Sequence, residues 1–307
     1  GTLLIGAAIS IGNLVVPVLI GRRYPARAAS LMGGFTATMA VGATAATATT
    51  AALAATHGWQ LATAVWGVLL GAVGLVLWLQ FAPRESDAAA AAATQVELRA
   101  ERAAHPVWRN PIAWLLGASF ACQSMAYYTV ATWLPTALRE SLGLTQVAAG
   151  WGASGFQVAG IAGSLLVPVF IAIVRPKEPL LVLVVACFWA VLPLGMLLAP
   201  QWWAAWVLLS GLAQGGYFTV ILLIVVRRAR SSDENRRLSA HVQTMGYIVA
   251  ATGPVVMGFV HERFPSWDVL FVVIAGLVLV MTTTGLLAAR RPEAAPFATA
   301  TPTQETP

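Results

Sequence analysis

The side chains of this 307-residue sequence that could do chemistry are mostly amides and phenols inside long apolar stretches. A polar group in an apolar medium is costly unless it finds a partner, so such groups are usually kept for a function. No Asp, Glu, Lys or Arg lies in the middle of any of these stretches. A carboxylate proton relay or an arginine clamp therefore cannot come from them. We predict a site that binds a small solute through neutral groups: Asn13, Gln123, Tyr127, Gln157, Gln214, Tyr217, Gln243 and Tyr247.

The spacing of these residues indicates which of them share a helix face. Gln123 and Tyr127 are four residues apart, as are Gln243 and Tyr247. Residues at this spacing lie one above the other on a helix, so each pair could form part of a wall around a small planar solute. Asn13 and Gln157 could instead hydrogen-bond to a neighbouring helix. Gly253-Pro254, shortly after Tyr247, predicts a kink that could act as a hinge.

Other residue patterns argue against an enzyme or a cofactor protein. The sequence has no G-x-S-x-G, no phosphate-binding G-x-x-x-x-G-K-[ST] and no H-E-x-x-H motif, so hydrolases of those types and ATP-driven pumps are disfavoured. Cys122 and Cys187 lie inside apolar stretches and show no metal-ligand spacing. The arginines of 227–230 and 236–237 are interpreted as signals of membrane topology. We predict no catalytic residue, no cofactor and no metal.

The elements that must hold these side chains are nine apolar stretches. Hydrophobic residues make up 58% of the chain and charged residues only 10%, and a helix needs about 20 residues to cross a bilayer. These runs are about twice as long as the strands of a membrane β-barrel and do not alternate. We therefore predict an all-α integral membrane protein with nine transmembrane helices, at 2–20, 28–55, 59–82, 112–136, 147–173, 179–199, 203–226, 239–260 and 268–289.

The basic residues indicate the orientation of these helices. All 18 Lys and Arg except Arg139 and Arg263 fall in alternate gaps between the stretches, and basic loops stay in the cytoplasm. We expect a multi-pass protein of the inner cell membrane with a cytoplasmic C-terminus. Topology also explains the net charge of +6, so nucleic acid is not an expected partner. Gly1 would lie outside and within a helix, which predicts that the sequence lacks the start of a longer protein.

The order of the stretches predicts the domain organisation. Residues 1–82 hold three helices, residues 83–111 form a polar cytoplasmic linker, residues 112–291 hold six helices, and residues 292–307 form a disordered tail. Many transporters are built from two six-helix halves joined by a cytoplasmic loop. Three further helices at the front would complete that plan, so the nine helices correspond to numbers 4 to 12 of twelve.

Three segments resemble one transporter family. GAAISIGNLVVPVLIGRRYPARAASLMG, WRNPIAWLLGASFACQSMAYYTVATWLPTAL and GLAQGGYFTVILLIVVRRARSSDENRRLSAHVQTMGYIVAATGPVVMGFVHERFPSW are similar to helices 4, 7 and 10–11 of the major facilitator superfamily, in its cyanate and 2-nitroimidazole porter branch. The resemblance implies a monomeric secondary active transporter that moves a small polar or anionic solute through the lipid bilayer by alternating access. A membrane sensor or regulatory protein that uses the same fold without transport is the alternative.

Overall fold

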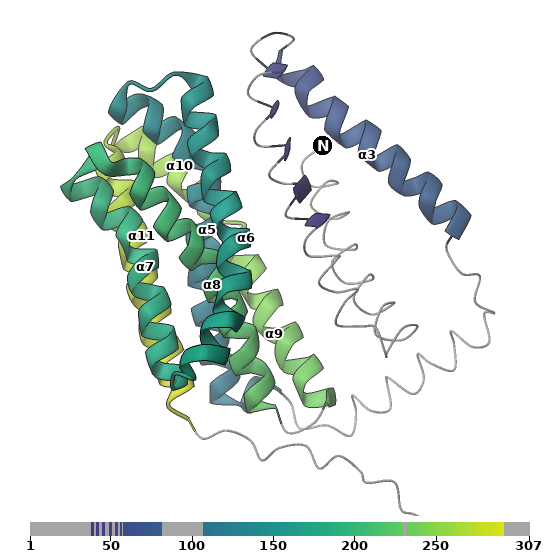
Figure 1. Cartoon of the computed structure of the whole chain (residues 1–307), viewed down its shortest axis with the longest axis vertical. Coiled ribbons are helices and arrows are strands. Elements are labelled where there is room, and N and C mark those ends of the chain that lie inside the picture. Colours follow the sequence, from purple (N-terminus) through teal and green to yellow (C-terminus); the bar gives the residue numbers. More distant parts are fainter. Residues whose placement is uncertain are drawn as a thin grey trace, which may run out of the picture.

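The computed structural model describes residues 38–39, 41–42, 45–46, 49–50, 53–54, 56, 58–81, 107–229 and 232–291. All regular elements in these ranges are helices, so the all-α prediction is confirmed for this part of the chain (Figure 1). The predicted stretch 2–20, most of 28–55, most of the linker 83–111 and the tail 292–307 lie outside the described residues, as does Asn13.

The described helices follow the predicted stretches with small shifts at their ends. They are α3 (Trp59–Phe81), η2 (Val107–Arg109), α5 (Pro111–Leu142), α6 (Gln146–Val174), α7 (Glu178–Leu198), η3 (Pro200–Trp202), α8 (Trp203–Arg228), α9 (Ser232–Ala250), α10 (Gly253–Arg263) and α11 (Trp267–Ala289).

Local sequence signals set several helix ends. Asn110 accepts a hydrogen bond from the backbone N–H of Ile112 at 2.9 Å, directly before α5, and Pro111 occupies the first turn. Thr145 caps α6 in the same way, through the N–H of Ala148 at 3.2 Å. Gly143 ends α5 with a φ of 67°, a left-handed conformation that glycine adopts without steric cost.

The predicted kink at Gly253-Pro254 is confirmed as a break between two helices. α9 ends at Ala250 and α10 begins at Gly253, with a turn at 251–252 between them. Pro254 has no N–H to donate to the carbonyl four residues earlier, so an uninterrupted α-helix cannot keep its full hydrogen bonding there. The expected single span 239–260 is therefore two helices in one long apolar region.

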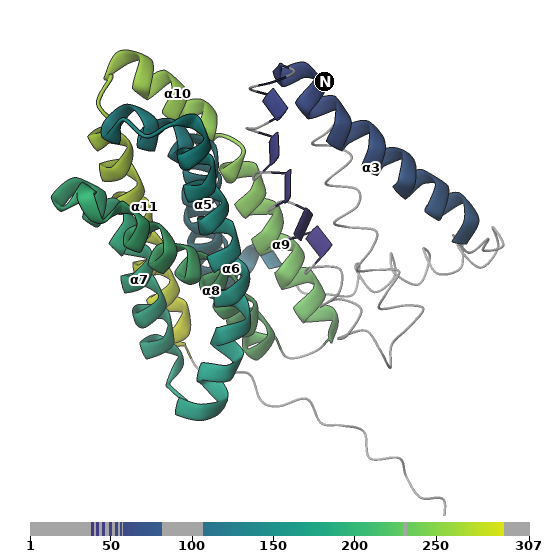
Figure 2. The same ribbon diagram turned by 45° about the horizontal axis from the view of Figure 1, so that its top comes forward.

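Helices α5 to α11 form one bundle with α5 in contact with most of its members. α5 packs along α9 and α11 and also contacts α6, α8 and α10. α7 packs against α8 and α11, and α6 packs against α8 (Figure 2). The α6–α8 contact is made by backbones, because a Cβ on Gly163 would lie 1.8 Å from the carbonyl oxygen of Leu212. Small residues allow this approach between membrane helices.

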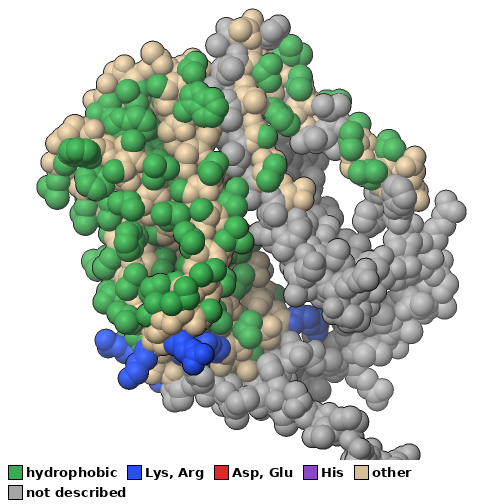
Figure 3. Space-filling model, viewed as in Figure 1, with side chains coloured by type: hydrophobic (Ala, Val, Ile, Leu, Met, Phe, Trp, Pro, Cys, Tyr) green, Lys and Arg blue, Asp and Glu red, His purple; other side chains and the backbone are tan. Residues whose placement is uncertain are grey.

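The outer surface of this bundle suits a lipid environment. Hydrophobic side chains cover the visible flank, while Lys and Arg gather at one end (Figure 3). That end, called here the basic end, carries Arg175, Lys177, Arg227, Arg290 and Arg291 at the ends of α6, α8 and α11. In the described part of the chain, six segments are long and apolar enough to cross a membrane, so the predicted number of nine is not confirmed: Gln60–Leu77, Gln146–Val174, Glu178–Leu198, Pro200–Arg228, Glu234–Arg263 and Trp267–Ala289.

The long helix α5 is absent from those six because it carries polar side chains. They are directed inward, since Ser119, Gln123, Ser124 and Thr129 are all buried. A helix of this kind is stable in a membrane only where neighbouring helices surround its polar face. The central position of α5 meets that requirement.

A buried ion pair closes the basic end of the bundle. Nη2 of Arg228 lies 2.6 Å from Oε2 of Glu178 and also donates to the carbonyl oxygen of Ala289 at 3.0 Å. The pair therefore joins α7, α8 and α11. Arg227 approaches the same carboxylate at 3.2 Å, but its side chain is 38% exposed. Arg228 thus has a packing role beyond the topological one predicted for this arginine cluster.

We expect Glu178→Gln to lower the free energy of unfolding by about 3–5 kcal/mol, because it leaves the buried guanidinium of Arg228 without a counter-charge. Denaturant unfolding of the protein in detergent micelles measures this loss. The double variant Glu178→Leu/Arg228→Met should recover most of it, since it removes both charges. The exposed Arg175→Gln is the matched control, and unfolding of Glu178→Gln at the denaturant concentration of the unaltered protein would contradict the assignment.

Candidate functional site

The predicted site residues of α5 and α6 meet near the middle of the bundle. Nε2 of Gln157 donates a hydrogen bond to the phenol oxygen of Tyr127 at 3.0 Å. The Tyr127 ring stacks on Phe156 with centroids 6.3 Å apart and planes at 20°. Tyr127 and Gln157 are each half-buried, so the bonded pair is fixed in position while part of it stays accessible.

Gln123 is buried and has both ends of its amide engaged. Its Nε2 donates to the backbone carbonyl of Gln214 at 3.3 Å, and its Oε1 accepts from the hydroxyl of Ser124 at 3.3 Å. The first of these bonds connects α5 to α8. Gln123 therefore positions the backbone of α8 beside α5.

The amide of Gln214 points in a different direction from its backbone carbonyl. A Cβ added to Gly160 would lie 2.0 Å from Nε2 of Gln214, so the glycine of α6 leaves the space that this amide occupies. The side chain of Gln214 forms no hydrogen bond with any residue in the described part of the chain. The residue is buried, at 9% exposed, so only a solute or water inside the bundle could reach its donor and acceptor.

Tyr217 lies in a separate polar contact at the seam of α5, α8 and α11. Its hydroxyl is 2.9 Å from Oγ of Ser119 and donates to the carbonyl oxygen of Met281 at 3.1 Å. Ser119 donates to the same carbonyl at 2.9 Å. Tyr217 has no exposed surface, so the structure places it inside the packed core and away from Tyr127.

Of the predicted pair Gln243 and Tyr247 on α9, Tyr247 adds an accessible ring. Tyr247 is 38% exposed and contacts Phe120 edge to face, with centroids 5.5 Å apart. Phe120 in turn lies 5.8 Å from the half-buried Phe218 of α8. Gln243 is half-buried one turn nearer the basic end and makes no hydrogen bond among the described residues. Tyr247 is thus the accessible end of an aromatic row that continues inward through the buried Phe120.

Sequence reasoning missed Ser119, Phe156 and Thr129 as parts of this region. Ser119 stands four residues before Gln123, as Gln123 stands four before Tyr127, so the spacing used for the glutamine would have found it. Phe156 carried no such signal, because a lone phenylalanine in an apolar helix is ordinary. Thr129 is buried without a hydrogen-bond partner and lies against Gly253 at the break between α9 and α10.

The arrangement supports binding by hydrogen bonds and ring contacts. In the described residues, no three His, Cys, Asp or Glu side chains come close enough together to hold a metal ion. The groups that converge on Tyr127 are uncharged. Such a surface suits a small planar solute with its own donors and acceptors.

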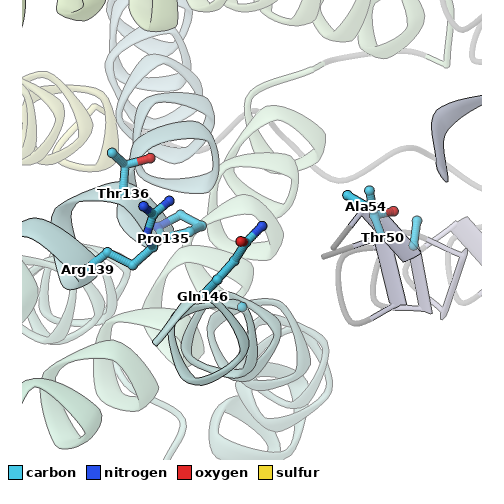
Figure 4. A pocket seen from close by; sticks show the side chains of 8 residues that line it. Thr50, Ala54, Pro135, Thr136, Arg139 and Gln146 are labelled. Carbon is cyan, nitrogen blue, oxygen red and sulfur yellow. The ribbon is translucent and has the colours of Figure 1, made fainter. Parts of the chain in front are cut away.

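A cavity of about 470 Å3 lies away from these residues, at the end of the bundle opposite the basic end. Pro135, Thr136 and Arg139 of α5 and Gln146 and Gly150 of α6 line one side (Figure 4). Ala46, Thr50 and Ala54 line the other side. None of the predicted site residues lies in its lining.

Comparison with known proteins gives the same family over most of the chain. The model of the Major Facilitator Superfamily matches residues 1–236 and, in an overlapping match, residues 138–306. The chain is 32% identical over 296 residues to the 2-nitroimidazole transporter of Escherichia coli (strain K12), covering 95% of this chain and 72% of that protein.

Two further relatives are similar over nearly the same length. The uncharacterized transporter YycB of Bacillus subtilis (strain 168) is 28% identical over 298 residues, covering 94% of this chain and 70% of its own. The cyanate transport protein CynX of E. coli (strain K12) is 26% identical over 284 residues, covering 91% and 71%.

We expect Tyr217→Phe to lower the free energy of unfolding by about 1 kcal/mol, because it removes one hydrogen bond while Ser119 still satisfies the Met281 carbonyl. Ser119→Ala alone should have a similar effect. The double variant should cost less than the sum of the two, because the Ser119–Tyr217 contact is lost in each single variant and Thr284 still donates to the Met281 carbonyl at 3.2 Å. A denaturant-unfolding double-mutant cycle measures this coupling, and strictly additive losses would contradict the contact between the two hydroxyls.

Proposed function

Because this chain belongs to the Major Facilitator Superfamily, we propose that it is a secondary active transporter of a small polar or anionic solute, cyanate-like or nitroimidazole-like, that works by alternating access. Two of its relatives are named as transporters of such solutes. The observation that carries the proposal is the bonded pair of Gln157 and Tyr127 within a helix bundle of apolar exterior.

The pair supports solute binding through its unused hydrogen-bonding capacity. Tyr127 uses its oxygen to accept from Gln157, so its own O–H proton is left to donate. The carbonyl oxygen of the Gln157 amide and the whole amide of Gln214 are also unused among the described residues. A planar solute with a nitro or cyanate oxygen can accept from the phenol, and Phe156 holds the phenol ring in place.

The other predicted residues take different parts in this proposal. Gln123 positions α8 beside α5, and Tyr217 stabilises the seam with α11. Tyr247 offers a ring at the accessible face. Gln243 would be reached by the solute nearer the basic end. Asn13, which lies outside the described residues, stays a predicted contact from the first group of helices.

Alternating access would use the packing of α5 to α11 as one rigid unit. Backbone contacts between α6 and α8 and the ion pair of Glu178 with Arg228 resist internal deformation. The break between α9 and α10 supplies a point at which the wall of the path can bend. We further propose a monomer in the inner cell membrane, with the basic end and the C-terminus in the cytoplasm, since loops rich in Lys and Arg stay there.

Uptake by cells expressing the chain tests the function directly. We expect gradient-dependent accumulation of labelled 2-nitroimidazole or cyanate that stops when the ion gradients are dissipated. No flux of either solute at normal surface expression would contradict the transporter assignment and favour a sensor that uses the same fold.

We expect Gln157→Leu to raise the KM for the solute about tenfold, because the loss of one hydrogen bond leaves Tyr127 misplaced and removes a polar group from the site. Tyr127→Phe should raise KM to a similar extent, and the two changes together should cost less than the product of the single effects. Initial uptake rates measured across a range of solute concentrations give the KM of each variant. Gln201→Ala, at an exposed position of η3, is the matched control. Unchanged KM in both site variants would refute the site.

A further inference from the structure

Arg139 stands out at the end of the bundle opposite the basic end. It lies near the end of α5 and lines the cavity together with Thr136 and Gln146 (Figure 4). It forms no ion pair with any described residue. Arg228, at the other end, is buried against a carboxylate, so the two ends of the bundle treat their arginines differently.

The neighbouring carboxylate is turned away from the cavity. Oε2 of Glu140 accepts a hydrogen bond from the indole N–H of Trp267 at 2.8 Å and lies 3.7 Å from Nε2 of His261. The His261 ring stacks on Trp267 with centroids 4.0 Å apart. Consecutive helix residues are about 100° apart around the axis. Glu140 is therefore held on the side of α10 and α11, while Arg139 faces the cavity.

The other side chains that line the cavity carry no charge. They belong to Ala46, Thr50, Ala54, Pro135, Thr136, Gln146 and Gly150. A concave surface with one sign of charge and a low-dielectric wall concentrates ions of the opposite sign. A guanidinium also offers several N–H donors in a planar fork, which suits oxygen acceptors. Thr136 and Gln146 can add neutral donors to the same solute.

From this geometry we infer that the cavity beside Arg139 captures small monoanions at the entrance to the transport path, before they reach Tyr127. The inference rests on the proposed function in taking the solute to be an anion that is transported and bound near Tyr127. Arg139 is in this sense a specificity-determining residue. Arg139 attracts the solute to the cavity, and the neutral groups near Tyr127 bind it in the middle of the bundle.

Uptake kinetics with labelled cyanate test the role of the charge. Arg139→Gln should raise KM about fivefold and leave Vmax unchanged, because a single charge a few ångströms from the solute in water changes its local concentration by about that factor. Arg139→Lys, which keeps the charge, should stay within about twofold. Raising the ionic strength should increase KM in the unaltered protein and much less in Arg139→Gln, since salt screens the attraction.

Arg263→Gln is the matched control, because Arg263 lies at the same end of the bundle, on α10 and outside the cavity lining. An equal rise in KM for Arg263→Gln, an unchanged KM for Arg139→Gln, or a fall in Vmax alone would overturn the inference. A fall in Vmax alone would point to a contact of Arg139 with lipid headgroups.

A thiol placed in the cavity measures the local charge without transport. Thr136→Cys, in a chain whose Cys122 and Cys187 are replaced by Ala, is treated with an anionic and a cationic methanethiosulfonate. Relative to a free thiol, the anionic reagent should react about fivefold faster than the cationic one, and Arg139→Gln should remove this preference. Equal preference with and without Arg139 would overturn the inference. If the unaltered protein does not take up cyanate but shows the Arg139-dependent preference, the proposed solute is wrong and the anion-capturing cavity stands.

Discussion

A polar side chain in an apolar helix bundle must find its hydrogen-bond partner inside the protein, because lipid offers none. Helix α5 carries most of these groups. Because they are spaced four residues apart, they lie along one face of α5 and form hydrogen bonds to neighbouring helices. Ser119 reaches the Met281 carbonyl of α11, Gln123 reaches the backbone of α8, and Tyr127 accepts from Gln157 of α6. One polar face of α5 thereby joins three neighbouring helices.

These connections require close backbone packing, which the glycines of α6 and α8 allow. Gly163 lets the backbone of α6 meet that of α8, and Gly160 leaves the space in which the amide of Gln214 lies. A larger residue at Gly160 would displace the amide. The same small residues thus bring the helices together and leave the amide of Gln214 unused beside Gly160. Packing and a binding surface here have a common cause.

The helices themselves could be predicted from the sequence, because long apolar runs with polar ends leave few alternatives. The break at Gly253-Pro254 could also be predicted, since it follows from local backbone chemistry. The partner of each polar side chain could not, because it depends on how each helix is rotated about its axis. Gln214 and Tyr217 are three residues apart, yet one has an unused amide and the other a core hydroxyl. The burial of Arg228 was missed because its partner, Glu178, is 50 residues away in the sequence.

The two ends of the bundle use charge in opposite ways. At the basic end, Arg228 donates hydrogen bonds to a carboxylate and to two backbone carbonyls. Its positive charge is therefore neutralised within the protein. At the other end, Trp267 and His261 hold the carboxylate of Glu140, and Arg139 keeps its charge for the cavity. An ion pair between residues 139 and 140 would cancel that field. The indole–carboxylate hydrogen bond holds the carboxylate of Glu140 on the side of α10 and α11, away from Arg139.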